Sequence, residues 1–261
     1  MRNRSENQIE VYLIRHGATN ANREHRYLGR TEEPLSEEGR EELKAFQRQG
    51  IYPDPASLQA LFVSPMERCR ETAELLFGDC EQHVIPEFRE MDFGLFEGKN
   101  YQDLQGDVRY QVWIDSNGTI PFPEGESRED FIARCRKGFE EMLRIAIAGV
   151  IGRNEEDKNA EDKNAENDRN VKNQKNTDNQ KKLEKLENTE KQQDAAKQKN
   201  RDENLKIAAV VHGTIMAVCS SFTDGEDFDF QIGNGEGYRC KVTVGQSSGE
   251  IYMDKLCKLV M

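Results

Sequence analysis

The sequence predicts an α/β fold, a three-layer α/β/α sandwich with a mostly parallel central sheet. An apolar run at residues 11–14 stops abruptly at Arg15-His16-Gly17, as a buried strand does when it delivers polar residues to a sheet edge. A second run, residues 207–211, is apolar enough to be buried on both faces, which places it at the centre of the sheet. It ends in His212-Gly213, so two strands are expected to deliver histidines to one edge.

The first of these strand ends has the residue types of a phosphate site. Arg15 carries a permanently charged guanidinium that suits phosphate, and His16 has a nitrogen that can act as nucleophile or base near neutral pH. Gly17 leaves its backbone amide unobstructed. An Arg-His-Gly triplet alone indicates little, because a histidine beside an arginine is more often a structural or surface residue. The interpretation therefore depends on the other motifs of the chain.

The overall charge of the chain is acidic. Its 261 residues have a formal net charge of -12, an isoelectric point near 5.0 and a mean hydropathy of -0.88. Proteins that bind nucleic acid or a membrane surface usually present a basic face, so neither partner is expected. An anionic ligand would be repelled by the overall charge, and a phosphate site must hold its positive charge locally, through Arg15 and Arg68.

Much of this polarity is concentrated in residues 153–204. The stretch consists largely of Asn, Lys, Glu, Asp and Gln, and its only large apolar residues are Val171, Leu183 and Leu186. It cannot bury enough apolar surface to offset the entropy lost on ordering, so we expect a long, charged, disordered insert. The remainder is long enough for one α/β core, and residues 1–261 are expected to form a single domain around this insert.

The six cysteines show no CxxC pair and no ligand-like spacing with the four histidines. They are expected to be reduced and structural, and no metal site is expected. The amino-terminal residues lack the apolar core of a signal peptide, and no stretch approaches about 18 apolar residues. We therefore expect a cytoplasmic protein.

Strands and helices alternate through the first part of the chain. A polar loop at residues 21–34 includes Gly29 and is expected to fold over the strand ends. Ser36 precedes a helix with glutamates in its first turn, and residues 60–63 form a second strand. Ser64-Pro65 is expected to open the next helix, with the proline at its first position, where the missing amide hydrogen costs nothing.

Charged residues that could serve the site follow this second strand. Arg68 falls in the first turn of the helix, where a helix N-terminus and a guanidinium together form a strong anion site. Arg70 lies on another face and is expected to be solvated. A third strand near residues 83–85 is followed by four carboxylates, and most of them are expected to be solvated surface groups. These are Glu87, Glu90, Asp92 and Glu97.

The remaining elements are a helical excursion, a long helix and a hairpin. In the excursion, residues 101–120, Trp113 and its aromatic neighbours either cover a ligand or pack as core, and core packing is the expected case. Ser127 starts the long helix with a capping-box-like pattern. Residues 238–245 and 249–258 alternate enough to make a hairpin at the edge of the sheet.

Four ordered motifs together resemble the histidine phosphatase superfamily. The resemblance covers roughly residues 9–149 and 206–222. Within the superfamily, the chain resembles the bacterial α-ribazole phosphatases and other small-molecule phosphatases more than it resembles the phosphoglycerate mutases. The motifs are Arg-His-Gly at 15–17, Ser-Pro-Met-Glu-Arg-Cys-Arg-Glu-Thr at 64–72, Phe-Arg-Glu-Met-Asp-Phe-Gly at 88–94 with Glu-Gly at 97–98, and Val-Val-His-Gly-Thr at 210–214.

The resemblance implies a phosphatase for a small phosphorylated metabolite, such as α-ribazole 5'-phosphate or a sugar phosphate, that needs no cofactor. It implies that His16 forms a phosphohistidine and that Glu90 protonates the leaving alcohol and then activates water. Cations can replace a metal electrostatically. The groups expected to hold the phosphoryl oxygens or the substrate are Arg15, Asn22, Gly29, Arg68, His212 and Gly213.

Two other functions stay open: a phosphoglycerate mutase-type phosphoryl transferase, and a catalytically silent binding or regulatory protein. Similar mutases carry an adjacent arginine pair after the general acid, whereas residues 99–130 contain only the separated Arg109 and Arg128. Leu28 also stands where mutases generally have a hydroxyl side chain. These departures favour hydrolysis, and the complete set of polar site residues argues against a silent protein. The sequence does not indicate an oligomeric state.

Overall fold

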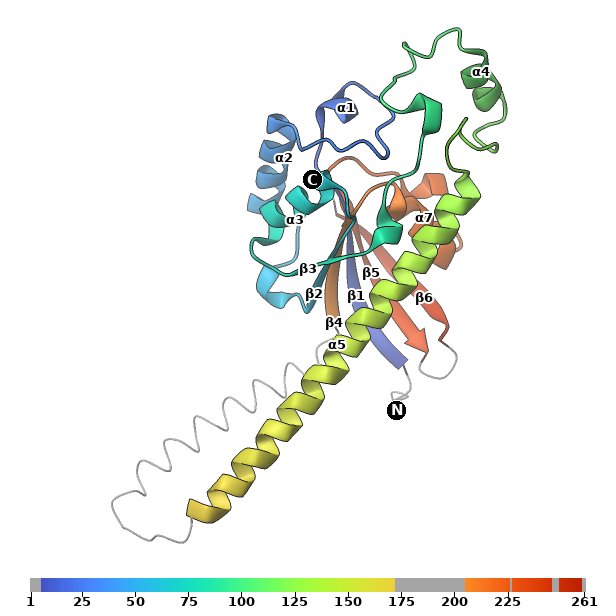
Figure 1. Ribbon diagram of the computed structural model, residues 1–261. Coiled ribbons are helices and arrows are strands. Elements are labelled where there is room, and N and C mark those ends of the chain that lie inside the picture. The colour runs from blue at the N-terminus through green and yellow to red at the C-terminus, as the bar shows by residue number, and fades with distance from the viewer. Residues whose placement is uncertain (1–5, 172–204, 226, 246–248, 260–261) are drawn as a thin grey trace. The chain divides into compact units, whose positions relative to one another are not determined.

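A six-stranded sheet with the order β3-β2-β4-β1-β5-β6 forms the centre of the computed structural model (Figure 1). β4 pairs in parallel with β1 and β2, and β2 with β3, whereas β5 is antiparallel to β1 and β6. The mostly parallel sheet and the interior position of β4 are therefore confirmed. The strands are β1 (Glu6–Arg15), β2 (Ala60–Val63), β3 (Gln82–Val84), β4 (Leu205–Val211), β5 (Gly237–Gly245) and β6 (Ile251–Leu259).

The structure describes residues 6–171, 205–225, 227–245 and 249–259. The chain divides into two compact units, each described by itself. The first, Met1–Ala146 with Leu205–Met261, contains the sheet, and the second is Ile147–Asn204. The helices are α1 (Asn20–Arg23), α2 (Glu37–Arg48), α3 (Glu67–Phe77), α4 (Val108–Asp115), α5 (Arg128–Val171) and α7 (Thr214–Phe222).

Helices cover both faces of the sheet, which confirms the three layers. Tyr12 and Ile14 of β1 share one apolar cluster with Cys69 and Ala73 of α3 and with Leu43 of α2. Successive side chains of a strand point to opposite faces, so Val11 and the other odd-numbered residues of β1 face the other layer. There α7 contacts β1, and Figure 1 shows α7 and the first turns of α5 on the side of the sheet opposite α2 and α3.

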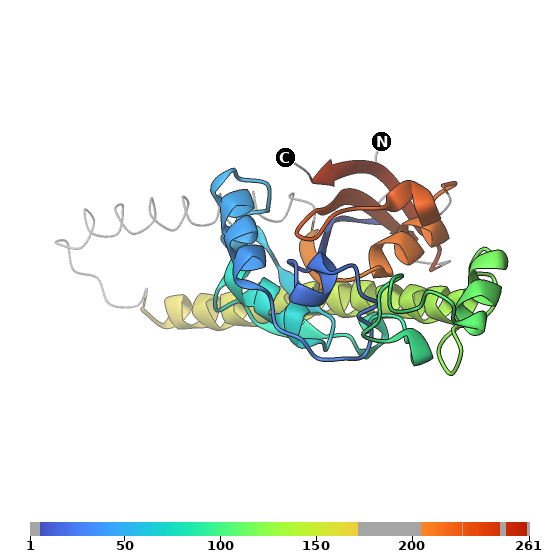
Figure 2. The same cartoon turned by 90° about the horizontal axis from the view of Figure 1, so that it is seen from above.

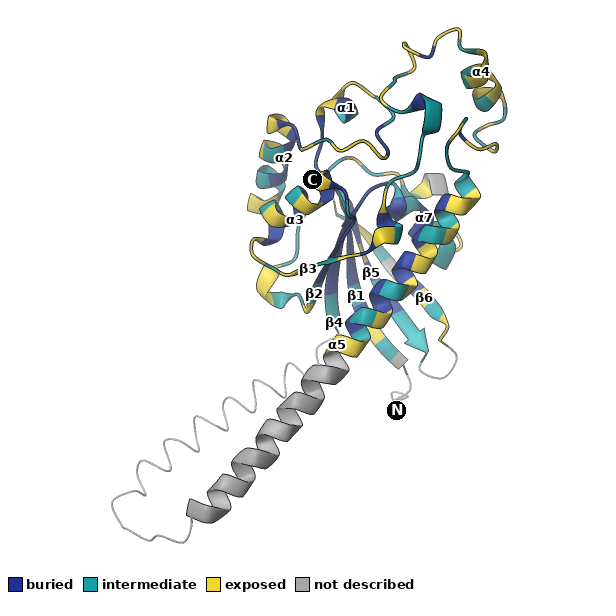
Figure 3. Cartoon of the chain, in the orientation of Figure 1, coloured by how far each residue is buried: buried dark blue, intermediate teal, exposed yellow. Residues whose placement is uncertain are grey.

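The strands closest to the centre are buried along most of their length (Figure 3). In β4 every side chain from Ile207 to Val211 is buried, as expected of an interior parallel strand. β5 and β6 form the predicted antiparallel hairpin at the sheet edge (Figure 2). Among the described residues, none of the helices combines the length and the apolar character needed to span a membrane.

The helix starts agree with the sequence in one case and differ in another. Ser36 caps α2 by accepting a hydrogen bond from the amide of Gly39, as predicted. α3 begins at Glu67 with Met66 as its N-cap, so the prediction that Pro65 is the first helical residue is wrong. The Ser64 hydroxyl accepts from the Met66 amide and contacts His212, and residues 65 and 66 form a bend before the helix.

The predicted insert, residues 153–204, lies only partly within the described residues. Helix α5 continues to Val171, so residues 153–171 are described as helical, and residues 172–204 lie outside the described residues.

Candidate active site

The carboxyl ends of β1 and β4 bring His16 and His212 together. Arg15 and Val211 are paired residues of these neighbouring strands, and the His16 amide donates to the Val211 carbonyl oxygen at 3.0 Å. The two imidazole rings lie edge to face with their centroids 5.0 Å apart. The two His-Gly sequences therefore meet at one sheet edge although they are far apart in the chain.

The hydrogen bond of His16 fixes which of its nitrogens can react. Nδ1 lies 2.7 Å from the carbonyl oxygen of Gly17, and a carbonyl only accepts, so Nδ1 carries the hydrogen and Nε2 carries the lone pair. Burial, followed by the charges of Arg68 and Arg15, lowers the pKa of His16 well below 6.5. His16 is therefore neutral near pH 7, with a free lone pair on Nε2.

His212 has a different set of partners. Its Nε2 lies 2.7 Å from the hydroxyl oxygen of Ser64, and its Nδ1 lies 3.9 Å from Oε2 of Glu90. Burial, followed by the neighbouring His16 and Arg68, lowers the pKa of His212 well below 6.5. Ser64 was not identified from the sequence as a site residue, although it begins the motif that contains Arg68.

Glu90 is the carboxylate of its segment that reaches His212. Its Oε2 accepts from the amide of Gly213 at 3.3 Å, and its Oε1 accepts from the amide of Met91 at 2.9 Å. The other three carboxylates are engaged elsewhere. Glu87 pairs with Lys137 at 3.7 Å, Asp92 with Arg30 at 3.0 Å, and Glu97 accepts from the amides of Gly29 and Thr31.

Arg134 of α5 holds the segment that carries Glu90. Its Nη2 donates to the carbonyl oxygen of Glu90 at 3.0 Å and its Nη1 to that of Glu87 at 2.8 Å. The guanidinium also pairs with Glu126 at 2.6 Å. No sequence signal pointed to this residue, because its role depends on carbonyl groups more than 40 residues away.

The two predicted phosphate-binding arginines are both anchored to the backbone. Arg15 donates from Nη1 to the carbonyl oxygen of Ile232 at 2.7 Å, and Arg68 is fully buried and donates to the carbonyls of Leu28, Gly29 and Thr31. The Nε atoms of both arginines are buried and have no hydrogen-bond partner among the described residues. Buried donors of this kind are costly unless a ligand satisfies them.

Gly29 is tied into the protein by both of its backbone groups. Its amide donates to Oε1 of Glu97 at 2.8 Å, and its carbonyl accepts from Arg68 at 2.9 Å. A Cβ atom at this position would lie 2.1 Å from the carbonyl oxygen of Met91, so close packing requires a glycine here. A substrate contact by Gly29 stays a prediction, because its amide hydrogen is already donated to Glu97.

Asn22 is oriented by two donors. Its Oδ1 accepts from the backbone amide of Thr19 and from Nδ2 of Asn234, both at 3.2 Å. Since a backbone amide only donates, Oδ1 must face it, and the Nδ2 group of Asn22 points away from these partners. Asn234 also donates to the carbonyl oxygen of His16 at 3.1 Å. Asn234, which was not identified from the sequence, thus joins Asn22 to the end of β1.

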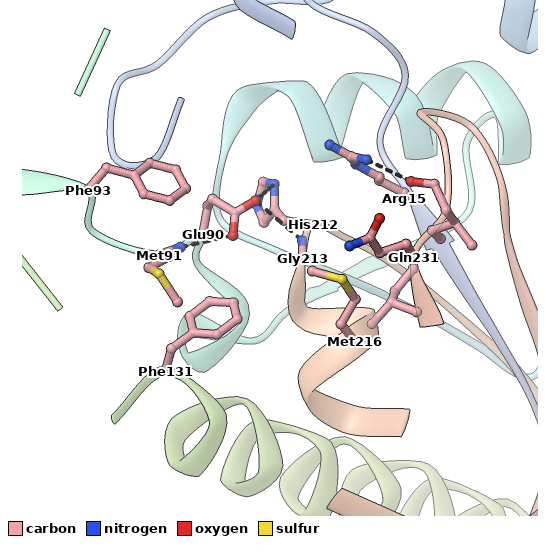
Figure 4. Close-up of a pocket in the computed structure, with 11 residues that line it drawn as sticks. Arg15, Glu90, Met91, Phe93, Phe131, His212, Gly213, Met216 and Gln231 are labelled. Atoms are coloured by element: carbon pink, nitrogen blue, oxygen red, sulfur yellow. Dashed lines mark hydrogen bonds and ion pairs between the residues drawn. The ribbon is translucent and has the colours of Figure 1, made fainter. Parts of the chain in front are cut away.

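A cavity of about 310 Å³ opens beside Glu90 and His212 (Figure 4). Figure 4 shows Arg15 and Gln231 on one side of Glu90, and Met91, Phe93 and Phe131 grouped on the other. Gln231 comes from the segment before β5, which was not identified from the sequence. Among the described residues, no cluster of three or more His, Cys, Asp or Glu side chains could hold a metal ion.

The chain is similar to curated proteins over about half of its length. The curated adenosylcobalamin/alpha-ribazole phosphatase of Salmonella typhimurium is 31% identical over 134 residues, which cover 49% of this chain and 64% of that protein. A probable phosphoglycerate mutase GpmB of Cronobacter sakazakii is 32% identical over 133 residues, which cover 48% of this chain and 59% of that protein. The chain thus matches less than two thirds of the length of either relative.

The fold is shared with solved structures. The alpha-ribazole phosphatase from Shigella flexneri superposes with a TM-score of 0.58 at 21% identity, over 97% of this chain and 98% of that one. The family model of the histidine phosphatase superfamily (branch 1) matches residues 11–151, which is more than half of the chain. This protein therefore belongs to branch 1 of the histidine phosphatase superfamily.

Proposed function

We propose that the protein is a phosphomonoester hydrolase that acts through a phosphohistidine at His16 on a small phosphorylated metabolite. The state of His16 carries this proposal: the ring is buried and neutral, and Nδ1 is bound to Gly17, so the lone pair of Nε2 is available. Two arginines that lower its pKa lie close enough to attract a phosphate to the same place.

In the first step, Nε2 of His16 attacks phosphorus and forms a P–N bond. The P–O bond to the alcohol breaks, and the carboxylic acid of Glu90 gives its proton to the leaving oxygen. Glu90 is suited to this role because it lines the cavity and lies next to His212.

In the second step, the Glu90 carboxylate removes a proton from water, and the resulting oxygen nucleophile attacks phosphorus. The P–N bond breaks, so inorganic phosphate and neutral His16 are released and Glu90 is again protonated. Dividing one difficult displacement into two easier ones is the usual advantage of covalent catalysis.

The remaining polar groups stabilise the transferring phosphoryl group. Arg15 and Arg68 each keep a buried Nε donor without a partner among the described residues, and phosphoryl oxygens would satisfy these donors. His212 and the Nδ2 group of Asn22 are expected to donate further hydrogen bonds. The amide of Gly213 can join them when Glu90, which now accepts from it, turns to the substrate.

Hydrolysis is favoured over a mutase reaction by the surroundings of Arg109. This exposed arginine pairs with Asp107 at 2.7 Å and is not one of the described residues that line the cavity, whereas Arg128 lines the adjoining one. The two therefore do not form the pair of cations that would hold a sugar-acid carboxylate. The likeness to the probable mutase GpmB nevertheless makes phosphoryl transfer to a second substrate the alternative to test.

The test is hydrolysis of an aryl phosphate in the presence of a chelator. We expect full activity and a phosphoenzyme that is labile in acid and stable in base, as a phosphorylated imidazole is. Loss of activity with the chelator would contradict the metal-independent route, and a chain that hydrolyses no phosphomonoester would be a silent member of the family. Faster transfer of the phosphoryl group to 3-phosphoglycerate than to water would identify a mutase.

The substrate would then be sought with phosphorylated metabolites. α-Ribazole 5'-phosphate and sugar phosphates are the first to compare, because the relatives' names and the sequence resemblance point to them. The ratio kcat/KM across this set measures which leaving alcohol the site accepts.

A further inference from the structure

A second cavity, of about 300 Å³, adjoins the one beside Glu90. Several residues line both cavities, so the two lie next to each other. These residues are Met91, Phe93, Phe131, Gly213 and Met216.

The walls of the second cavity are mainly aromatic. Trp113 stacks on Phe122 with the ring centroids 4.6 Å apart, and the ring centroids of Tyr27 and Phe93 lie 5.2 Å apart. Burial raises the pKa of Tyr27, so its hydroxyl stays neutral. Among the described residues that line this cavity, Arg128 is the one with a full charge.

The leaving oxygen of a bound substrate would lie at the junction of the two cavities. Gly213 lines both, and its amide donates to Glu90, the proposed proton donor, at 3.3 Å. A phosphoryl group held at His16 and a leaving oxygen near Glu90 would direct the rest of the alcohol along Met91 and Phe93 into the aromatic cavity.

We propose that this aromatic cavity binds the alcohol part of the substrate, and that this alcohol is uncharged and carries an apolar ring. The inference rests on the proposed function, because the occupant is the leaving group of the same reaction. A polyhydroxyl or charged alcohol would lose hydration against these rings, and few of the lining side chains, namely those of Tyr27, Asn117 and Arg128, are polar enough to replace it. An apolar ring gains by leaving water. The rigid, stacked aromatic side chains keep the cavity open at little entropic cost.

Binding can be measured without turnover. Trp113 is the only tryptophan of the chain, so its fluorescence reports on this cavity alone. In the inactive variant His16→Ala, 2-phenylethyl phosphate should change the emission in a saturable manner, and glycerol 1-phosphate and inorganic phosphate should not. Glu90→Gln is a second variant with slow turnover should His16→Ala fail to fold.

A pair of matched variants tests the position of the subsite. Ile120 and Ile114 are similarly exposed, at 38% and 44%, but only Ile120 is among the described residues that line the aromatic cavity. Ile120→Asp should lower the ratio of kcat/KM for 2-phenylethyl phosphate to kcat/KM for glycerol 1-phosphate about tenfold. Ile114→Asp should leave this ratio at the wild-type value.

The outcomes separate this inference from the proposed function. A fluorescence response to 2-phenylethyl phosphate in a protein that hydrolyses no phosphomonoester would support the subsite and overturn the hydrolase. Hydrolysis of glycerol 1-phosphate or 3-phosphoglycerate with a higher kcat/KM than 2-phenylethyl phosphate would support the hydrolase and overturn the subsite. An equal change of the ratio in Ile120→Asp and Ile114→Asp would also overturn it.

Discussion

His16 and His212 follow strands with the same local pattern and are held in different ways. Both stand after the last residue of a buried parallel strand, and both precede a glycine. Nδ1 of His16 is bound to the carbonyl oxygen of its own neighbour Gly17, whereas Nε2 of His212 is bound to the hydroxyl of Ser64 on another strand end. The partner, and not the sequence pattern, therefore determines which nitrogen of each ring can react.

This difference suggests distinct roles for the two rings. With Nδ1 bound, His16 keeps its Nε2 lone pair free, as the proposed attack on phosphorus requires. His212 has its Nε2 occupied by Ser64 and its Nδ1 near Glu90, so it is suited to hold the phosphoryl group and not to attack it. Substitutions of the two histidines and of the residues that hold them test these roles.

The largest effect is expected from removing each histidine in turn. His16→Ala should abolish phosphoenzyme formation and lower kcat by about 10⁴-fold or more, because the nucleophile is lost. His212→Ala should lower kcat by about 10²- to 10³-fold, as removal of one charge-stabilising donor does, and should still form a phosphoenzyme. Steady-state rates and ³²P labelling measure both. Labelling of His16→Ala but not of His212→Ala would exchange the two roles.

The effect of substituting Glu90, which lies beside His212, should depend on the leaving group of the substrate. Glu90→Gln should lower kcat for an alkyl phosphate by about 10²-fold or more and for an activated aryl phosphate far less, because a good leaving group needs no proton. A burst of aryl alcohol followed by slow phosphate release would show that dephosphorylation has become limiting. The control is Glu87→Gln, since Glu87 pairs with Lys137 and should not affect either rate. Equal slowing of both esters with no burst would refute the assignment.

Substitutions of the residues that hold the two imidazole rings should have smaller effects on kcat/KM. Asn234→Asp removes the donor that holds Asn22 and the His16 carbonyl, and Ser64→Ala removes the hydroxyl that holds His212. Ser64→Ala should lower kcat/KM by about tenfold, the usual worth of one buried hydrogen bond. Asn234→Asp should lower it by at least as much, because it removes two. Ser64→Ala should act mainly on kcat and Asn234→Asp mainly on KM. A change of thermal stability with unchanged kinetics would show that these residues support only the fold.

The two histidines should make the free energy of unfolding depend on pH in the same way. Both have pKa values well below 6.5 in the folded protein, so the unfolded chain binds more protons as the pH falls through about 6.5. The free energy of unfolding should then decrease by at most about 1.4 kcal/mol per histidine for each pH unit below that value. NMR titration of the imidazole protons measures the pKa values directly, and a midpoint near 6.5 for either ring would contradict its burial in the neutral form.

No effect on turnover is expected from removing residues 154–204. The residues of the candidate site all lie in the unit formed by Met1–Ala146 and Leu205–Met261. We therefore predict that a Gly/Ser linker in place of residues 154–204 preserves folding and kcat on small substrates, because β1 and β4 can still pair. Circular dichroism and steady-state kinetics test this. A folded but inactive deletion would show that the removed segment contributes to the site.

The elements that depend on a few neighbouring residues could be predicted from the sequence alone. They include a strand buried on both faces, two strand ends with His-Gly, and an arginine in the first turn of a helix. These signals were enough to predict the parallel order of the sheet and the meeting of His16 with His212, because the ends of adjacent parallel strands lie together.

How those residues are held could not be predicted, because it depends on contacts between distant segments, which leave no periodic trace in the sequence. These contacts place Glu90 near His212, tie Arg134 to the Glu90 segment and join Asn234 to Asn22. The same is true of Gly29, whose amide is already bound to Glu97. The aromatic cavity likewise forms only when loops from separate parts of the chain pack together, because its shape is a property of the packed side chains and not of any one segment.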